Sequence, residues 1–206
     1  MSAAIATEAR YTPEDLLAMP DGKRYELVKG RLVEREMGAE SSWVGTRLTS
    51  RLDRFCEDNG LGIVWGAGNG YQCVAHGPGL VRRPDVSFVK KGRLPGDIAP
   101  KGWVKIPPDL AVEVVSPHDS AEDLEEKLDD YRTAGVPLIW VIYPELRKVK
   151  IFRLDGSAGE LREDDVLSGE GVIPGFHCLV REILPRRSLA DEPRTTPAGT
   201  NGAGSA

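Results

Sequence analysis

The fold is decided by residues 108–140, whose sequence is PDLAVEVVSPHDSAEDLEEKLDDYRTAGVPLIW. Residues 109–115 form an almost continuous apolar run, which is typical of a central strand that is covered on both faces. The following segment, 121–134, has apolar residues at helical spacing, with Ser120 as its expected N-cap and Gly135 as its stop. A second apolar run closes the stretch. We therefore predict a buried strand, a capped amphipathic helix and a second buried strand, in that order.

Two charged residues in this stretch do not fit packing alone. Glu113 is the only charge inside a strand whose two faces are otherwise apolar. An unpaired carboxylate buried there costs several kcal/mol, so we expect a cation beside it. Lys127 shares the apolar face of the predicted helix with Leu128 and Tyr131. Either only its stem is buried while its ammonium reaches solvent, or the helix packs a charged lysine against the sheet.

Composition and charge narrow the classes of protein. The 206 residues suffice for one sizeable domain, and 40% apolar and 29% charged residues are ordinary for a globular protein. A net charge of -5 argues against a protein that coats nucleic acid, but it does not exclude a local contact patch. Three cysteines without CxxC spacing indicate a reducing compartment. Because no membrane span or signal peptide is evident, we expect a cytoplasmic protein with no membrane partner.

The chain divides into one predicted domain and two tails. Residues 1–10 are small and polar, residues 186–206 are low in apolar residues, and we expect both to be disordered. The predicted domain covers residues 11–185. It should begin with a short helix opened by Thr12-Pro13, followed by a β-hairpin that turns at Lys29-Gly30.

Two local signals concern the middle of this domain. An amphipathic helix is predicted from Ser41 or Ser42, either of which can cap it, to a stop at Asn59-Gly60. Further on, Asn69-Gly70 is typical of a hairpin turn, which predicts that the segments on its two sides pair with each other.

A long basic loop is predicted between residues 90 and 108. A loop of about 20 residues inside a compact domain is usually functional or mobile. Basic residues interleaved with an aromatic side chain can contact single-stranded or frayed nucleic acid. An ordinary surface loop is the alternative. The candidate contacts are Lys90, Lys91, Arg93, Lys101 and Trp103.

Asp85 is a second candidate acid, at the start of a predicted strand that Pro84 opens. Alone it would be an ordinary surface aspartate, but with Glu113 and Lys127 it forms a more specific set. Carboxylate oxygens suit a hard divalent ion such as Mg²⁺, which keeps several waters and takes a substrate phosphate as a ligand. A lysine beside it can position a water or offset charge in the transition state. Glu26, in the predicted hairpin, is more simply explained as a solvent-exposed residue.

Four segments resemble the Uma2 family of the PD-(D/E)XK nuclease superfamily. They are YELVKGRLVE (25–34), RPDVSFV (83–89), PDLAVEVVSP (108–117) and EEKLDDYRTAGVPLIWVIYPELRKVKIFR (125–153). The resemblance extends over residues 11–185. It implies a restriction-endonuclease-like α/β core, in which a mixed central sheet of four or five strands is flanked by helices, with an extra N-terminal β-hairpin.

The resemblance also implies roles for individual residues. Asp85 matches the aspartate of the PD motif, and Glu113 matches the second acid. The parent motif has a lysine two positions after that acid, where this chain has Val115. Lys127 matches the site in the following helix from which this family supplies the lysine. Asp85, Glu113 and the backbone carbonyl of Val114 would then hold the metal.

Two other positions carry weaker implications. Glu26 matches a possible additional acid near the N-terminus. Relatives often have a histidine at the start of the long helix, where this chain has Ser41-Ser42. Any help that this histidine gives to phosphate binding is therefore absent here.

These implications give a first hypothesis, a Mg²⁺- or Mn²⁺-dependent endonuclease that hydrolyses phosphodiester bonds in DNA, with Lys127 orienting the attacking water. Cutting both strands usually needs two active sites, which a homodimer would supply. One alternative is a catalytically inactive nuclease-fold protein with a binding or regulatory role; the acidic net charge favours it, and the intact set of two acids and a lysine disfavours it. Another alternative is a metal-dependent phosphohydrolase acting on RNA or nucleotides.

Overall fold

The structure is a computed structural model that describes residues 10–35, 38–72, 79–117 and 119–186. The predicted tails, residues 1–10 and 186–206, lie outside the described residues apart from Arg10 and Arg186.

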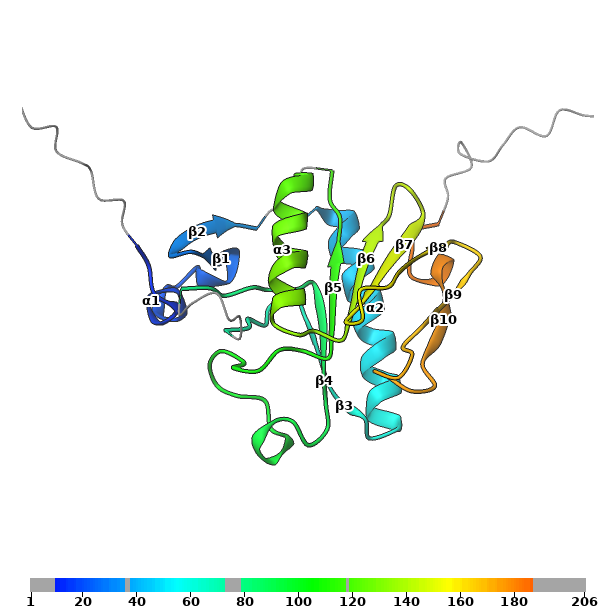
Figure 1. The fold of residues 1–206 in the computed structure, drawn as a ribbon, viewed down its shortest axis with the longest axis horizontal. Helices are drawn as coiled ribbons and strands as arrows, with labels where there is room; N and C mark the ends of the chain where they lie inside the picture. The colour runs from blue at the N-terminus through cyan, green and yellow to red at the C-terminus, as the bar shows by residue number, and fades with distance from the viewer. Residues whose placement is uncertain (1–9, 36–37, 73–78, 118, 187–206) are drawn as a thin grey trace, which may run out of the picture.

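A six-stranded mixed sheet forms the centre of the molecule (Figure 1). Its strand order is β3-β4-β5-β6-β7-β8; only β5 and β6 are parallel, and every other neighbouring pair is antiparallel. The strands are β3 (Gly62–Gly66), β4 (Val86–Lys90), β5 (Leu110–Val114), β6 (Leu138–Tyr143), β7 (Lys148–Arg153) and β8 (Ala158–Arg162). The predicted α/β core is confirmed, with more strands in its sheet than the four or five expected.

The predicted strand–helix–strand unit corresponds to β5, α3 (Ala121–Thr133) and β6. All five residues of β5 are buried, as its apolar run predicted. The Ser120 side chain accepts a hydrogen bond from the Asp123 amide at 3.0 Å, which caps α3. Gly135 follows the helix with a φ of +77°, a conformation that glycine adopts without steric cost. Local capping and hydrophobic burial therefore agree on this unit.

Helices cover the two faces of the sheet. Helix α2 (Ala39–Asp58) packs Val44, Leu48 and Leu52 into the larger core. Helix α3 covers the opposite face, where Leu128 contributes to a smaller apolar cluster. Helix α2 begins earlier than predicted, because Gly38 is its N-cap and provides no side-chain hydrogen bond.

The last short elements extend the larger core. They are β9 (Val166–Ser168), β10 (His177–Leu179) and the 3-10 helix η3 (Val180–Glu182). Leu167, Cys178 and Val180 are buried with the α2 residues. No helix in the described ranges is long and apolar enough to cross a membrane.

An N-terminal unit lies beside the sheet, at the left of Figure 1. It consists of α1 (Pro13–Ala18), η1 (Gly22–Arg24), β1 (Tyr25–Val28) and β2 (Arg31–Glu34). The predicted hairpin is confirmed: β1 and β2 are antiparallel, and Lys29 and Gly30 both have positive φ, at 52° and 80°. Leu27 exchanges backbone hydrogen bonds of 3.0 and 2.8 Å with Val81. This pairing brings β1 beside residues 79–83.

The predicted hairpin at Asn69-Gly70 is wrong. Strand β3 pairs instead with β4, with Ile63 opposite Val89. A Cβ atom on Gly70 would lie 2.5 Å from the Trp103 ring. The glycine is thus needed for close packing against an aromatic side chain, a requirement that the local sequence does not reveal.

Candidate functional site

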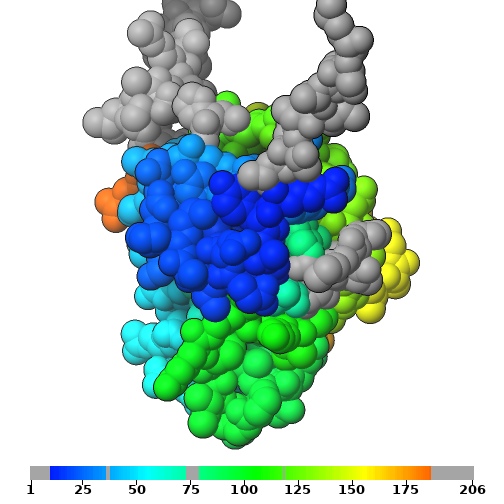
Figure 2. Space-filling model, turned by 90° about the vertical axis from the view of Figure 1, so that its left-hand side faces the viewer, coloured from blue at the N-terminus to red at the C-terminus, as the bar shows by residue number. Residues whose placement is uncertain are grey.

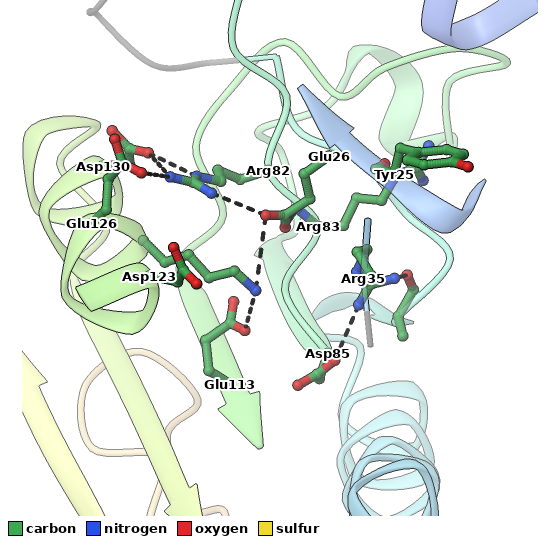
Figure 3. A network of polar contacts seen from close by, with 12 residues as sticks. Tyr25, Glu26, Arg35, Arg82, Arg83, Asp85, Glu113, Asp123, Glu126 and Asp130 are labelled. Atoms are coloured by element: carbon green, nitrogen blue, oxygen red, sulfur yellow. Dashed lines mark hydrogen bonds and ion pairs between the residues drawn. The ribbon is translucent and has the colours of Figure 1, made fainter. Parts of the chain in front are cut away.

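A cavity of about 200 Å³ lies where the C-terminal end of β5 meets α2, α3 and the N-terminal hairpin (Figure 3). Both candidate acids and the candidate lysine line it. The lining side chains that carry charge are Glu26, Glu34, Arg35, Arg82, Asp85, Glu113, Asp119, Asp123, Glu126 and Lys127.

Asp85 is fixed against β5 by the backbone. Its own amide donates to the Val112 carbonyl at 2.9 Å, and its Oδ2 accepts from the Val114 amide at 2.8 Å. Its Oδ1 accepts from Arg35 Nη2 at 3.1 Å. Burial raises the pKa of Asp85 above its ordinary value, although the Val114 amide and Arg35 act in the opposite direction. The carboxylate therefore lies next to the strand that carries Glu113.

Glu113 is only 4% exposed and faces helix α3. Its Oε1 accepts from the Tyr131 hydroxyl at 2.6 Å, and its Oε2 accepts from Lys127 Nζ at 3.1 Å. Burial, together with the nearby charge of Asp85, raises the pKa of Glu113 to about 7 against the opposing charge of Lys127. A cation placed at these two acids would stabilise the ionised form of Glu113.

Lys127 directs its ammonium toward the acids. Its Nζ lies 3.1 Å from Glu113 Oε2 and 3.8 Å from Glu26 Oε2, and its side chain is 22% exposed. Burial lowers its pKa, but the charges of Glu113, Glu26 and Asp85 outweigh this and hold the pKa above the ordinary value. The lysine is therefore charged at neutral pH, where it can donate hydrogen bonds but cannot serve as a base. The alternative in which only the stem of Lys127 is buried while its ammonium reaches solvent does not describe this contact.

Glu26 is a buried partner of the site, so its interpretation as a solvent-exposed residue is wrong. It is 1% exposed, because β1 pairs with the segment that carries Arg82 and Arg83. Its Oε1 accepts from the Arg83 amide at 2.7 Å, and its Oε2 accepts from Arg82 Nη1 at 3.0 Å. Burial alone would raise its pKa, but the charges of Lys127 and Arg82 hold the pKa below the ordinary value.

Arg82 connects this acid to helix α3. It is 3% exposed, and its Nε donates to Asp130 Oδ2 at 2.7 Å. Its Nη2 lies 3.6 Å from Glu126 Oε2. The guanidinium thus holds the N-terminal hairpin and the helix together around buried carboxylates (Figure 3).

Comparison with known proteins places this architecture in a family. The sequence model of Uma2, described as "Putative restriction endonuclease", matches residues 13–183. The chain belongs to the Uma2 family. A crystal structure described as a "putative nuclease belonging to DUF820" from Anabaena variabilis superposes with a TM-score of 0.70. It is 16% identical in sequence, and the match covers 84% of this chain and 96% of that chain. No match was found among curated proteins.

The Uma2 assignment confirms the resemblance predicted from the sequence and supports a nuclease-like function. The structural match, at its low identity, supports the fold alone.

Four contributors to the site were missed by sequence reasoning: Arg35, Arg82, Asp130 and Tyr131. Asp130 and Tyr131 had a usable signal, because they follow Lys127 by three and four residues and so share its helix face. Asp130 is buried, at 8% exposed. Arg82 gave no local signal, since its contact with Glu26 depends on pairing between distant segments.

The predicted basic loop does not reach this site. It leads into the N-terminal end of β5 at the bottom of Figure 1, whereas the site lies at the C-terminal end. Trp103 is 8% exposed, and its Nε1 donates to the Pro13 carbonyl at 3.0 Å, so the expected exposed stacking face is buried against the N-terminal unit. Arg93 forms an ion pair with Asp109 at 2.7 Å.

The lysines of this loop are also remote from the cavity. Lys90 Nζ donates to the Gly171 carbonyl at 3.2 Å. Lys91 and Lys101 are exposed. Ser41 and Ser42, by contrast, do line the cavity.

The donor set fits a hard divalent cation. Seven carboxylates and three cationic side chains are among the described residues lining the cavity, so its charge is strongly negative. Each oxygen of Glu113 accepts one protein hydrogen bond and keeps a further lone pair for a metal. Within the described ranges, no three His, Cys, Asp or Glu side chains converge as a complete ligand group. One or two carboxylates with added waters is the coordination that Mg²⁺ commonly uses.

Proposed function

We propose that this protein is a Mg²⁺- or Mn²⁺-dependent endonuclease that hydrolyses phosphodiester bonds in DNA. The observation that carries the proposal is the contact of 3.1 Å between Lys127 Nζ and Glu113 Oε2, in a cavity that Asp85 also lines. Two acids and a lysine drawn from separate elements, with Glu113 buried and Asp85 and Lys127 partly buried, are costly to retain without a function. Membership of the Uma2 family supports the same class of reaction.

Asp85, Glu113 and the backbone carbonyl of Val114 are the groups that would hold the metal. A bound Mg²⁺ polarises the phosphoryl oxygen and lowers the pKa of a coordinated water. A cavity this acidic would repel a phosphodiester if it held no cation, because like charges at short range destabilise each other.

The remaining residues of the site orient these groups. Lys127 stays protonated, so its role is to position the attacking water and to stabilise negative charge as the phosphodiester is cleaved. Tyr131 fixes one oxygen of Glu113 by a hydrogen bond of 2.6 Å. Glu26 acts as an additional acid that holds the lysine in place, and Arg82 neutralises part of its charge.

Plasmid nicking tests the proposal. Supercoiled DNA is incubated with the protein and Mg²⁺ or Mn²⁺, and the relaxed form is measured. Asp85→Asn and Lys127→Met should each lower the rate by roughly a hundredfold or more, as expected when a charge that acts in the transition state is removed. Lys91→Met is the matched control, because it removes an exposed lysine at the other end of β5 and should leave nicking unchanged.

Undiminished nicking in both site variants would contradict the assignment.

Calorimetric titration with Mn²⁺ separates an active site from an inactive descendant of the fold, since Glu113→Gln should lose binding that the wild type shows. A panel of DNA, RNA and nucleotides identifies a phosphohydrolase of another specificity. Sedimentation tests the homodimer that cutting of both strands would use.

A further inference from the structure

A groove of about 430 Å³ runs beside the N-terminal hairpin and adjoins the cavity. Its described lining residues are Arg10, Val28, Lys29, Arg31, Val33 and Glu126. Val28, Val33 and Glu126 also line the cavity, so the two hollows share a wall. A chain lying in the groove would therefore lead directly to the acids.

The charge changes sign between the two hollows. In the groove, three cationic side chains stand against one carboxylate, whereas the cavity has seven carboxylates and three cations. The whole chain carries a net charge of -5, so this basic strip is a local departure from an acidic protein. Cations along the groove can bind successive phosphates of one strand. The carboxylates of the cavity can hold a metal ion, which would bind one of those phosphates.

Lys29 is the groove cation that is most clearly open to a ligand. The Lys29 side chain is 81% exposed, and its ion pair with Glu126, at 2.7 Å, is open to solvent. Exposed pairs of this kind contribute little, so Lys29 can exchange its partner for a phosphate at small cost. Val33 is 40% exposed at the junction with the cavity, and Tyr11 is 37% exposed nearby, with its amide bonded to the Gly30 carbonyl at 2.8 Å. These two side chains provide apolar and aromatic surface for bases.

The hairpin is held firmly enough to act as a guide. Gly30 donates to the Gly79 carbonyl at 3.1 Å, and Leu27 is paired with Val81. In the space-filling view the N-terminal unit, in blue, covers the upper part of this side of the molecule, above the green loop that precedes β5 (Figure 2). The strip is thus separate from the basic loop singled out by the sequence.

We infer that one strand of nucleic acid lies along the β1–β2 hairpin, with its phosphates on Arg10, Lys29 and Arg31 and its bases against Val33 and Tyr11. A basic groove with an aromatic side chain beside it is the combination that binds single strands. The cavity of about 200 Å³ has room for one phosphodiester of that strand. The inference rests on the proposed function and adds the path by which the substrate enters.

Fluorescence anisotropy with a labelled single-stranded oligonucleotide tests the inference. The measurement is made over a series of salt concentrations, first in EDTA, so that no strand is cut, and then with Mg²⁺ in the slow-cutting Lys127→Met background, so that the cavity holds its cation. The double variant Arg10→Ala/Lys29→Ala should bind roughly tenfold more weakly at moderate salt, and its salt dependence should fall by about one to two released counterions. The matched control is Lys91→Ala/Lys101→Ala, which removes two exposed charges from the loop before β5 and should bind like the wild type.

The outcomes separate this inference from the proposed function. If the wild type binds or nicks DNA while the groove variant binds as tightly as the control, the path is wrong and the nuclease assignment stands. Weaker binding by the loop variant alone would move the path to the other end of β5. Tighter binding of a duplex than of the single strand would overturn the choice of a single strand. A wild type that neither binds nor cuts would remove both proposals.

Discussion

The two ends of strand β5 carry charged residues in opposite ways. Before its first residue, the loop holds exposed lysines, and its arginine and tryptophan are tied to the body of the protein. Near its last residue, Glu113 is buried with Lys127 and a second acid beside it. The first end has the composition of a nucleic-acid contact, and the second has the geometry on which the proposed active site rests.

The difference teaches that the energetic cost of burying a charged side chain is a better guide to a candidate site than the number of charged residues in a segment. An exposed lysine in a loop costs almost nothing, so its presence indicates little. A buried carboxylate must be paired, and a folded protein keeps such a group only where its partners are also built in. The misfit of Glu113 within an apolar strand was therefore the informative signal.

The largest expected difference between the two ends of β5 is in the free energy of unfolding that is lost when an arginine is removed from each. Arg82→Ala leaves the buried Glu26 and Asp130 without their shared cation, and it should lower the free energy of unfolding by about 3–5 kcal/mol. Arg93→Ala should lower it by about 1 kcal/mol, because Asp109 keeps a hydrogen bond from the Lys90 amide. Urea denaturation measures both. Equal losses would remove the distinction between the two ends.

A smaller effect is expected in the pH dependence of stability. The pKa of Glu113, about 7 in the folded protein, lies above its ordinary value of 4.5, so the folded state binds more protons between these values. The stability of the wild type should therefore fall as pH rises from about 4.5 to 7 relative to Glu113→Gln. Added Mg²⁺ at pH 7.5 should raise the melting temperature of the wild type but not of this variant. A difference between the two proteins that does not change with pH would contradict the buried-acid description.

The tryptophan of the loop gives a third comparison. Trp103→Phe removes the hydrogen bond to Pro13 and some packing against Leu16 and Val81, which should cost about 1–2 kcal/mol. Binding of single-stranded DNA should be unchanged. Reduced binding with unchanged stability would instead restore the role that the sequence predicted for this residue.

The smallest effect should come from Glu126, the one carboxylate among the described residues of the groove. Glu126→Gln removes a negative charge from the strand path, so it should tighten oligonucleotide binding by about twofold. Glu14→Gln, an exposed acid outside this groove, is the comparison variant. A weaker complex would show that Lys29 needs its partner to hold the strand.

Much of the fold was predictable because its signals are local. The β5–α3–β6 unit follows from apolar periodicity, a serine cap and a glycine stop, each of which acts within a few residues. The N-terminal hairpin follows from Lys29-Gly30 in the same way. The pairing of β3 with β4 was not predictable, since it depends on residues far apart in the sequence.

The candidate site shows the same limit. Periodicity and burial placed Glu113 and Lys127 on facing elements, and their contact agrees with that interpretation. Asp85 was a candidate only in combination with these two residues, and the family resemblance then matched it to the aspartate of the PD motif. Arg82 and the burial of Glu26 depend on how the hairpin docks, which no local pattern encodes. The loop composition pointed to nucleic acid, but it could not show that Trp103 folds back against α1.

The cation beside Glu113 comes from Lys127 in α3, and this has a consequence for the order in which the site forms during synthesis. Glu26, Asp85 and Glu113 all leave the ribosome before Lys127 does, at a pace of about 5–20 residues per second. Until the helix follows, the emerging chain has acids that cannot be buried without a counter-charge, and the closed site cannot form. The site therefore cannot close, and the proposed cutting cannot begin, before α3 has emerged.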